Sequence, residues 1–120
     1  MSEIRATTIS DAAGTGPIAL TGQSAAKAWI NYDRATSTSI EGSFNIASIT
    51  DLGTGNQSTS FTSAFSNGRY SATGTCFGIG NVAWQSALLA SSLNVQTAYT
   101  VSGGLLDYEY VCVSAHGDLA

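Results

Sequence analysis

Short runs of alternating apolar and polar residues, separated by turn residues, constrain this chain more than any other feature. In Ala26–Asp33 the residues Ala26, Ala28, Ile30 and Tyr32 share one face, which is the alternation of a half-buried strand. Similar runs recur at close intervals. They predict further strands at 40–51 (one or two strands), 58–65, 69–77, 95–102 and 107–115.

Such a series of short strands is typical of an all-β fold. We expect an antiparallel β-sandwich or jelly-roll-like domain of six to eight strands. Glycine and asparagine predict hairpin turns at 51–56 and 66–68. Residues 78–94 are ambiguous, since alanine and leucine favour a short helix and the alternative is a long loop that includes Trp84.

The first 24 residues have a different sequence pattern, with no sustained periodicity and several glycines. Apolar residues are nevertheless spaced along this segment: Ile4, Ile9, Ile18 and Leu20. Such spacing suggests that these side chains bind in grooves of a partner protein. The alternative is that the segment is a disordered terminus. We therefore expect an extended N-terminal anchoring arm at 1–24, followed by a β domain with one core at 25–120.

Charge is scarce in this sequence. Four basic and eight acidic residues stand beside 17 Ser, 14 Thr and 13 Gly, and the net charge is −4. A surface made largely of hydroxyl groups and backbone suits contacts with other proteins. The basic residues are scattered singly and form no basic surface that could bind nucleic acid. No apolar run approaches the roughly 20 residues of a membrane helix, and no secretory signal is recognisable. We expect a soluble protein that is made in the cytoplasm.

The ionisable residues form no constellation that catalysis would need. His116 is the only histidine and has no nucleophile motif beside it. Asp107 and Glu109 are two residues apart and could share one face of a strand. Such a pair could in principle cleave a glycoside, but we favour its interpretation as a row of polar side chains exposed to solvent. The glycines from Gly74 to Gly80 lack the lysine of a phosphate-binding loop. Four further acidic residues are interpreted as isolated in turns: Asp33, Glu41, Asp51 and Asp118. We expect no catalytic residue, cofactor or protein metal site, with a single ion on a symmetry axis left open.

The two cysteines, Cys76 and Cys112, have no close metal-ligand spacing. Because thiols of cytoplasmically made proteins usually stay reduced, we predict two buried free thiols. A disulfide that joins two late strands is the alternative.

Trp29 departs from the alternation of its strand, because it lies on the otherwise polar face. This position indicates a two-sided core or a subunit contact. Three further aromatic residues join it as candidates for a subunit interface or a glycan contact, since an amphipathic ring can stack on a sugar. They are Trp84, Tyr108 and Tyr110.

Two segments, AKAWINYD (Ala26–Asp33) and SFNIASITDLGTG (Ser43–Gly55), resemble a module of virion proteins from marine and environmental bacteriophages. Those proteins are tail fibres, head fibres and capsid decorations. The segment TTISDAAGTGP (Thr7–Pro17) is similar to the leader that precedes the module. The resemblance covers the first half well, and from Thr59 onward only the texture matches.

The resemblance implies a non-enzymatic structural protein on the virion surface. Its arm would anchor it to phage capsid or tail proteins, and its β domain would self-associate as a homotrimer, like the family's fibres and decorations. The short length favours a capsid decoration, spike or head fibre over a long tail fibre. The alternative is a host-surface carbohydrate-binding tail fibre or tip module, and a glycan depolymerase has the least support.

Overall fold

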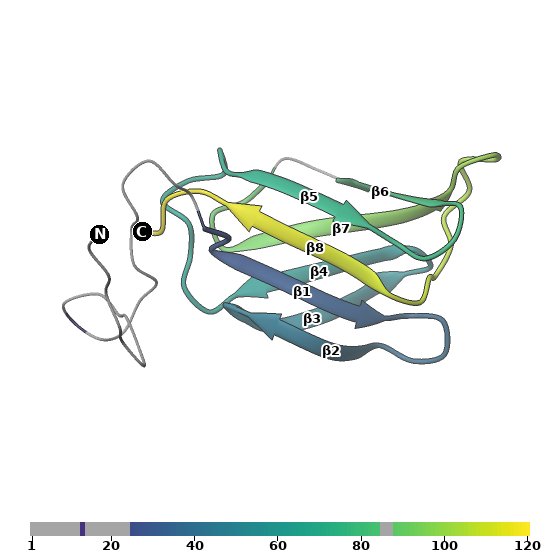
Figure 1. Cartoon of the computed structure of the whole chain (residues 1–120), viewed down its shortest axis with the longest axis horizontal. Coiled ribbons are helices and arrows are strands. Elements are labelled where there is room, and N and C mark those ends of the chain that lie inside the picture. The colour runs from purple at the N-terminus through teal and green to yellow at the C-terminus, as the bar shows by residue number, and fades with distance from the viewer. Residues whose placement is uncertain (1–12, 14–24, 85–87) are drawn as a thin grey trace, which may run out of the picture.

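The protein folds into a β-sandwich, as predicted (Figure 1). The computed structural model describes Ala13, residues 25–84 and residues 88–120, and the side chain of Trp84 lies outside this description. Within these residues the structure contains no helix. Its strands are β1 (Ala28–Asp33), β2 (Ser39–Phe44), β3 (Ile46–Gly53), β4 (Asn56–Phe61), β5 (Ser71–Thr75), β6 (Gly80–Trp84), β7 (Ser92–Tyr99) and β8 (Val111–His116).

The strands form two antiparallel sheets of four. The first sheet has the order β2-β1-β8-β5, and the second has the order β3-β4-β7-β6. Hairpins join β1 to β2, β3 to β4 and β6 to β7, and the chain changes sheet at each of the other connections. Strands β1, β8, β4 and β7 are therefore the inner strands, with neighbours on both sides.

The core lies between these inner strands, where every second residue is buried because side chains alternate along a strand. The buried side chains are Ala28, Ile30, Tyr32, Gln57, Thr59, Phe61, Leu93, Val95, Thr97, Val111, Val113 and Ala115. Most buried polar groups among them have partners, whereas Gln57 Nε2 has none among the described residues. Tyr32 Oη donates to Gln57 Oε1 at 3.0 Å, and Thr59 Oγ1 donates to the Leu93 carbonyl at 3.1 Å. The alternation predicted for the first strand is confirmed.

An aromatic cluster closes the core where the chain crosses from β4 to β5. Phe65 is only 1% exposed, stacks on Tyr70 at a centroid distance of 4.2 Å, and meets Phe61 edge-on at 5.0 Å. The hydroxyl of Tyr70 lies 3.2 Å from the carbonyl oxygens of Leu89 and Ser92. The cluster thus fixes an irregular segment to both sheets.

The change of sheet between β2 and β3 takes a single residue, Asn45. Its φ of 58° is in the left-handed region, which asparagine tolerates better than most residues. Its side chain donates to the carbonyls of Lys27 and Ser63 at 2.9 and 3.0 Å and accepts from the Ser63 N–H at 2.7 Å. These bonds hold the corner that joins one edge of each sheet.

Three local predictions were wrong. Residues 80–84 form neither a helix nor a loop but strand β6, which is stabilised by pairing with β7; most of the alanines and leucines that favour helix follow this strand. Residues 66–68 do not form a hairpin, since this segment carries the chain from the second sheet to the first. The last strand begins at Val111 and not at Asp107, because Tyr110 has a φ of 48° and interrupts extended backbone.

The turn between β3 and β4 requires glycine at Gly55. Its φ is 63°, and a Cβ there would lie 2.5 Å from the Thr97 carbonyl oxygen and 2.7 Å from the Leu106 nitrogen. Gly78 has a similar φ of 75° but no atom within 4 Å of that position. We expect Gly55→Ala to lower the free energy of unfolding by about 2 kcal/mol through overpacking. Gly78→Ala should lower it by about 1 kcal/mol through backbone strain alone.

Urea denaturation of both variants measures this difference. Because the two glycines share the backbone conformation, Gly78→Ala is the matched control for the close approach of Thr97 and Leu106. Equal losses in the two variants would contradict the overpacking at Gly55.

Candidate binding surfaces

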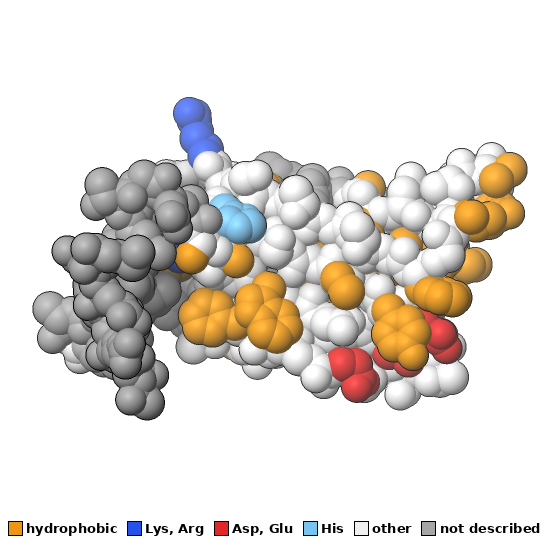
Figure 2. Space-filling view, in the orientation of Figure 1, with side chains coloured by type: hydrophobic (Ala, Val, Ile, Leu, Met, Phe, Trp, Pro, Cys, Tyr) orange, Lys and Arg blue, Asp and Glu red, His pale blue; other side chains and the backbone are white. Residues whose placement is uncertain are grey.

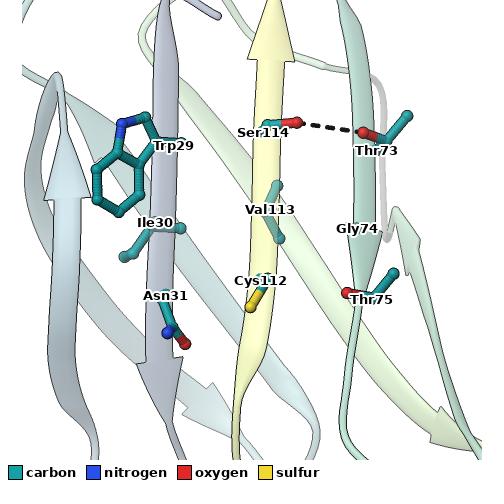
Figure 3. Close-up of a pocket in the computed structure, with 9 residues that line it drawn as sticks. All are labelled: Trp29, Ile30, Asn31, Thr73, Gly74, Thr75, Cys112, Val113 and Ser114. Carbon is teal, nitrogen blue, oxygen red and sulfur yellow. Dashed lines mark hydrogen bonds between the residues drawn. The ribbon is translucent and has the colours of Figure 1, made fainter.

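The first candidate surface is a groove on the outer face of the first sheet (Figure 3). The register aligns two rows of side chains across β1, β8 and β5. One row is Trp29, Ser114 and Thr73, and the other is Asn31, Cys112 and Thr75. Because the middle strand carries the small side chains, the face is hollowed along β8, and the hollow has a volume of about 430 Å³.

Trp29 lies on this outer face, as the alternation predicted, and the prediction of a two-sided core is wrong. Its side chain is 42% exposed. The indole packs over Gly42 of the neighbouring strand, where an added Cβ would lie 3.3 Å from two ring carbons. Phe44 stands opposite Trp29 in the register and is equally exposed. Figure 2 shows hydrophobic side chains side by side on this face. Trp29 and Phe44 together form an apolar patch, which we call the aromatic platform.

The two cysteines lie on opposite sides of the first sheet, and both are free thiols. Cys76 is half-buried against the core, and burial raises the pKa of its thiol. Cys112 is exposed in the groove. The prediction of free thiols is confirmed, and the prediction that both are buried is wrong for Cys112. The alternation along β8 explains this, because Val111 and Val113 take the inward positions.

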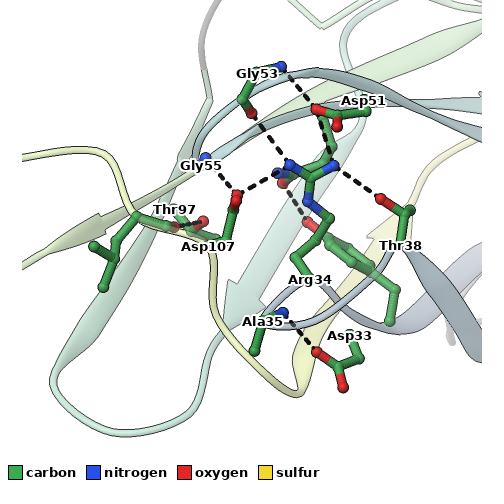
Figure 4. A network of polar contacts seen from close by, with 12 residues as sticks. Asp33, Arg34, Ala35, Thr38, Asp51, Gly53, Gly55, Thr97 and Asp107 are labelled. Atoms are coloured by element: carbon green, nitrogen blue, oxygen red, sulfur yellow. Dashed lines mark hydrogen bonds and ion pairs between the residues drawn. The ribbon is translucent and has the colours of Figure 1, made fainter.

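A buried arginine organises the loops at one end of the sandwich (Figure 4). The side chain of Arg34 is 5% exposed and forms ion pairs with Asp51 at 2.9 Å and with Asp107 at 3.0 Å. It also donates to Thr38 Oγ1 at 2.9 Å. Asp107 in turn accepts from the Gly55 N–H at 2.7 Å. We call these residues the Arg34 cluster, and their end of the sandwich the distal end.

The Arg34 cluster corrects two interpretations of the sequence. Asp51 is not isolated in a turn, and Asp107 does not share a strand face with Glu109. A signal was present, since Arg34 continues the inward phase of Ala28, Ile30 and Tyr32. A charged residue at an inward position indicates a buried ion pair.

Asp51 makes the cluster sensitive to acid. The Gly53 N–H and the Arg34 guanidinium both stabilise its carboxylate and so lower its pKa. A carboxyl whose pKa is lower in the folded than in the unfolded protein stabilises the fold above its unfolded pKa of about 4. This contribution is lost as the pH falls through the folded pKa.

The distal end also presents apolar side chains on the loops 76–79 and 100–110. The exposed residues are Phe77, Ile79, Val101, Leu105, Leu106 and Tyr110. The two loops contact each other, because Thr100 donates to the Ile79 carbonyl through its N–H at 3.2 Å and through its hydroxyl at 2.6 Å. The rings of Phe77 and Tyr110 meet edge-on, with centroids 6.0 Å apart. This apolar end is the second candidate surface.

The remaining candidates from the sequence have different positions. Tyr110 is exposed at the distal end, whereas Tyr108 is half-buried against the core. The four apolar residues of the arm lie outside the described residues: Ile4, Ile9, Ile18 and Leu20. His116 ends β8 opposite Ser71 of β5.

Within residues 25–84 and 88–120, no group of three or more His, Cys, Asp or Glu side chains is arranged to hold a metal ion. Nothing in the described residues forms a long apolar helix of the kind that crosses a bilayer. Comparison of the chain with protein-family models, with curated proteins and with solved structures finds no match. Its function must therefore be inferred from its own residues and their geometry.

Proposed function

We propose that this chain is a non-enzymatic structural protein of a phage virion. In this proposal it is a capsid decoration or spike of the head-fibre type, anchored through residues 1–24 and self-associating through its β domain. The observation that carries the proposal is that the two ends of the sandwich differ: the chain enters the domain at one end, and the distal loops lie at the other. The chain enters β1 at the end where the C-terminal residues pair, since Lys27 N donates to the Ala115 carbonyl and Ala120 N to that of Ala64. The loops of the distal end lie at the opposite end (Figure 1).

Such a difference between the two ends suits a protein that is held at one end and projects the other. An arm that precedes residue 25 would leave the domain at the end opposite to the Arg34 cluster. The distal loops would then face away from the attachment point. The resemblance of the first half to virion modules supports the same arrangement.

The state of the ionisable groups supports a role without catalysis. Arg34, Asp51 and Asp107 are engaged with one another, and Asp33 accepts from the backbone N–H of Ala35 at 2.7 Å. A catalytic constellation requires groups that converge on a substrate. Among the described residues, these groups stabilise loops.

Self-association is supported by exposed apolar side chains at the distal end. Val101 is 78% exposed and Phe77 is 61% exposed, and clustered exposure of this kind marks interaction surfaces. Association would also cover sheet edges, which otherwise invite uncontrolled pairing. The homotrimer follows from the resemblance, and the mass of the purified protein in solution tests it.

Deletion of residues 1–22 tests the anchor. The truncated protein should fold, as judged by its circular dichroism, but should lose binding to virions that were assembled without this protein. Cosedimentation with those particles measures the binding. Retained binding by the truncated protein would refute the anchor.

A length-matched pair of variants separates sequence from length. Replacing Ile4, Ile9, Ile18 and Leu20 by serine should weaken particle binding as strongly as the deletion, because burial of these side chains would supply the attachment energy. Replacing Thr7, Thr8, Ser10 and Thr15 by alanine changes the same segment without removing large apolar groups and should leave binding intact.

A further inference from the structure

The groove over β8 has the volume of a small-ligand site and is open to solvent. Its volume of about 430 Å³ falls within the range of about 300 to 1,000 Å³ typical of such sites. Its floor is Cys112 and Ser114, with β1 on one side and β5 on the other (Figure 3). Opposite side chains on neighbouring strands are about 5 Å apart, so a ligand in the groove reaches groups from all three strands.

The surface that lines the groove is mostly apolar, and its few polar groups are uncharged. Thr73 Oγ1 and Ser114 Oγ are hydrogen-bonded to each other at 3.2 Å, and Thr75 adds a second threonine hydroxyl. Asn31 has no hydrogen bond from its side-chain amide to any described residue, and its Oδ1 is buried. No Lys, Arg, His, Asp or Glu belongs to the described residues that line the groove. Neutral hydroxyls are the complementary ligand groups.

An apolar ring borders these polar groups. Trp29 lies in the same row as Ser114 and Thr73, and its indole lies over Gly42 beside Phe44. The aromatic platform is therefore continuous with the groove. A flat apolar surface next to neutral hydrogen-bonding groups matches the two sides of a sugar ring, its C–H face and its hydroxyls.

The same residues disfavour other ligand classes. A phosphorylated or carboxylated ligand would find no cationic side chain in the lining. A peptide strand would find no free backbone groups on the floor, because β1 and β8 are inner strands with partners on both sides. A second copy of this chain would bury the amide of Asn31 and three hydroxyls, which is costly unless every group is matched.

We infer that the groove together with the aromatic platform binds a neutral saccharide. In this site the indole of Trp29 stacks on a sugar ring. The hydroxyls of Thr73 and Ser114 and the side-chain nitrogen of Asn31 form hydrogen bonds with the sugar hydroxyls. The site is independent of the proposed anchoring function, because it uses none of residues 1–24 and none of the distal loops.

The test is a titration of the full-length isotope-labelled protein with cellotetraose, maltotetraose and chitotetraose, and with tetragalacturonate as an anionic comparison. At least one neutral tetrasaccharide should shift the NMR signals of the Trp29 indole N–H and the Asn31 side-chain amide in a saturable manner. Tetragalacturonate should not shift these signals. If no neutral compound shifts these signals at up to about 10 mM, the inference is overturned.

Variants assign the site. Trp29→Ala should weaken binding at least tenfold, and Asn31→Ala should weaken it several-fold. Ser114→Tyr fills the groove from an outward position without entering the core, and it should abolish binding in a folded protein. Phe77→Ala and Asn94→Ala are the matched controls, on the distal end and on the second sheet, and should change binding less than twofold. Binding that survives Ser114→Tyr would overturn the assignment.

Discussion

Replacing Phe65 by alanine should lower the free energy of unfolding by about 4 kcal/mol, the largest effect that we expect from a single substitution. Phe65 is almost fully buried, stacks on Tyr70 and meets Phe61 edge-on. Its removal leaves a cavity where the chain crosses between the sheets, and Leu119 loses its bridge partner's side chain. Thermal unfolding should show a fall in Tm of roughly 20 °C.

Phe44→Ala is the matched control, because it makes the same chemical change on a side chain that is 42% exposed. It should cost only about 1 to 2 kcal/mol, since a large part of the ring is already exposed to water. Equal losses from both substitutions would show that the aromatic cluster does not close the core.

Arg34→Ala should lower the free energy of unfolding by about 2 to 3 kcal/mol. Removing one partner of a buried ion pair costs about 3 to 5 kcal/mol. The lower value applies because Asp51 is 57% exposed and Asp107 is 30% exposed, so water partly replaces the guanidinium. Urea denaturation measures the change. Arg34→Lys should recover only part of the loss, since one ammonium group cannot reproduce the planar fork that contacts Asp51 and Asp107.

Arg69→Ala is the control, because Arg69 is exposed and its removal should change stability by no more than about 0.5 kcal/mol. The pH dependence adds a second readout. The lowered pKa of Asp51 means that the difference between the wild-type protein and Arg34→Ala is complete at pH 7 and shrinks below about pH 4. A difference that is constant from pH 7 to pH 3 would contradict the role of the ion pair.

The strands of the core could be predicted from the sequence because their alternation is local. Ala28, Ile30 and Tyr32 are buried as their spacing predicts, and so are Val111 and Val113. Strand β6 could not be predicted in this way, because Gly80–Trp84 is short and has no clear alternation, and its extended conformation depends on pairing with β7. The break at Tyr110 had no signal, since tyrosine rarely takes a positive φ.

The candidate surfaces were only partly predictable. The outward position of Trp29 follows from the alternation along its strand, and Trp29 indicated a candidate contact surface from the sequence alone. The groove itself depends on the pairing of three strands, which bring residues near 30, 74 and 113 together. The spacing of residues within one strand does not specify how that strand is aligned with its neighbours. Arg34 carried a local signal through its inward phase, but its partners Asp51 and Asp107 are far along the chain.

The Arg34 cluster has a consequence for the kinetics of any contact at the distal end. One side chain connects the loop that follows β1, the end of β3 and the loop that precedes β8. The two loops lack regular structure, yet folding has already restricted their conformations. A partner that docks there therefore loses little loop entropy on association. Arg34 thereby makes an irregular surface behave as a rigid one, with bound lifetimes set by its apolar contacts and not by reordering of the loops.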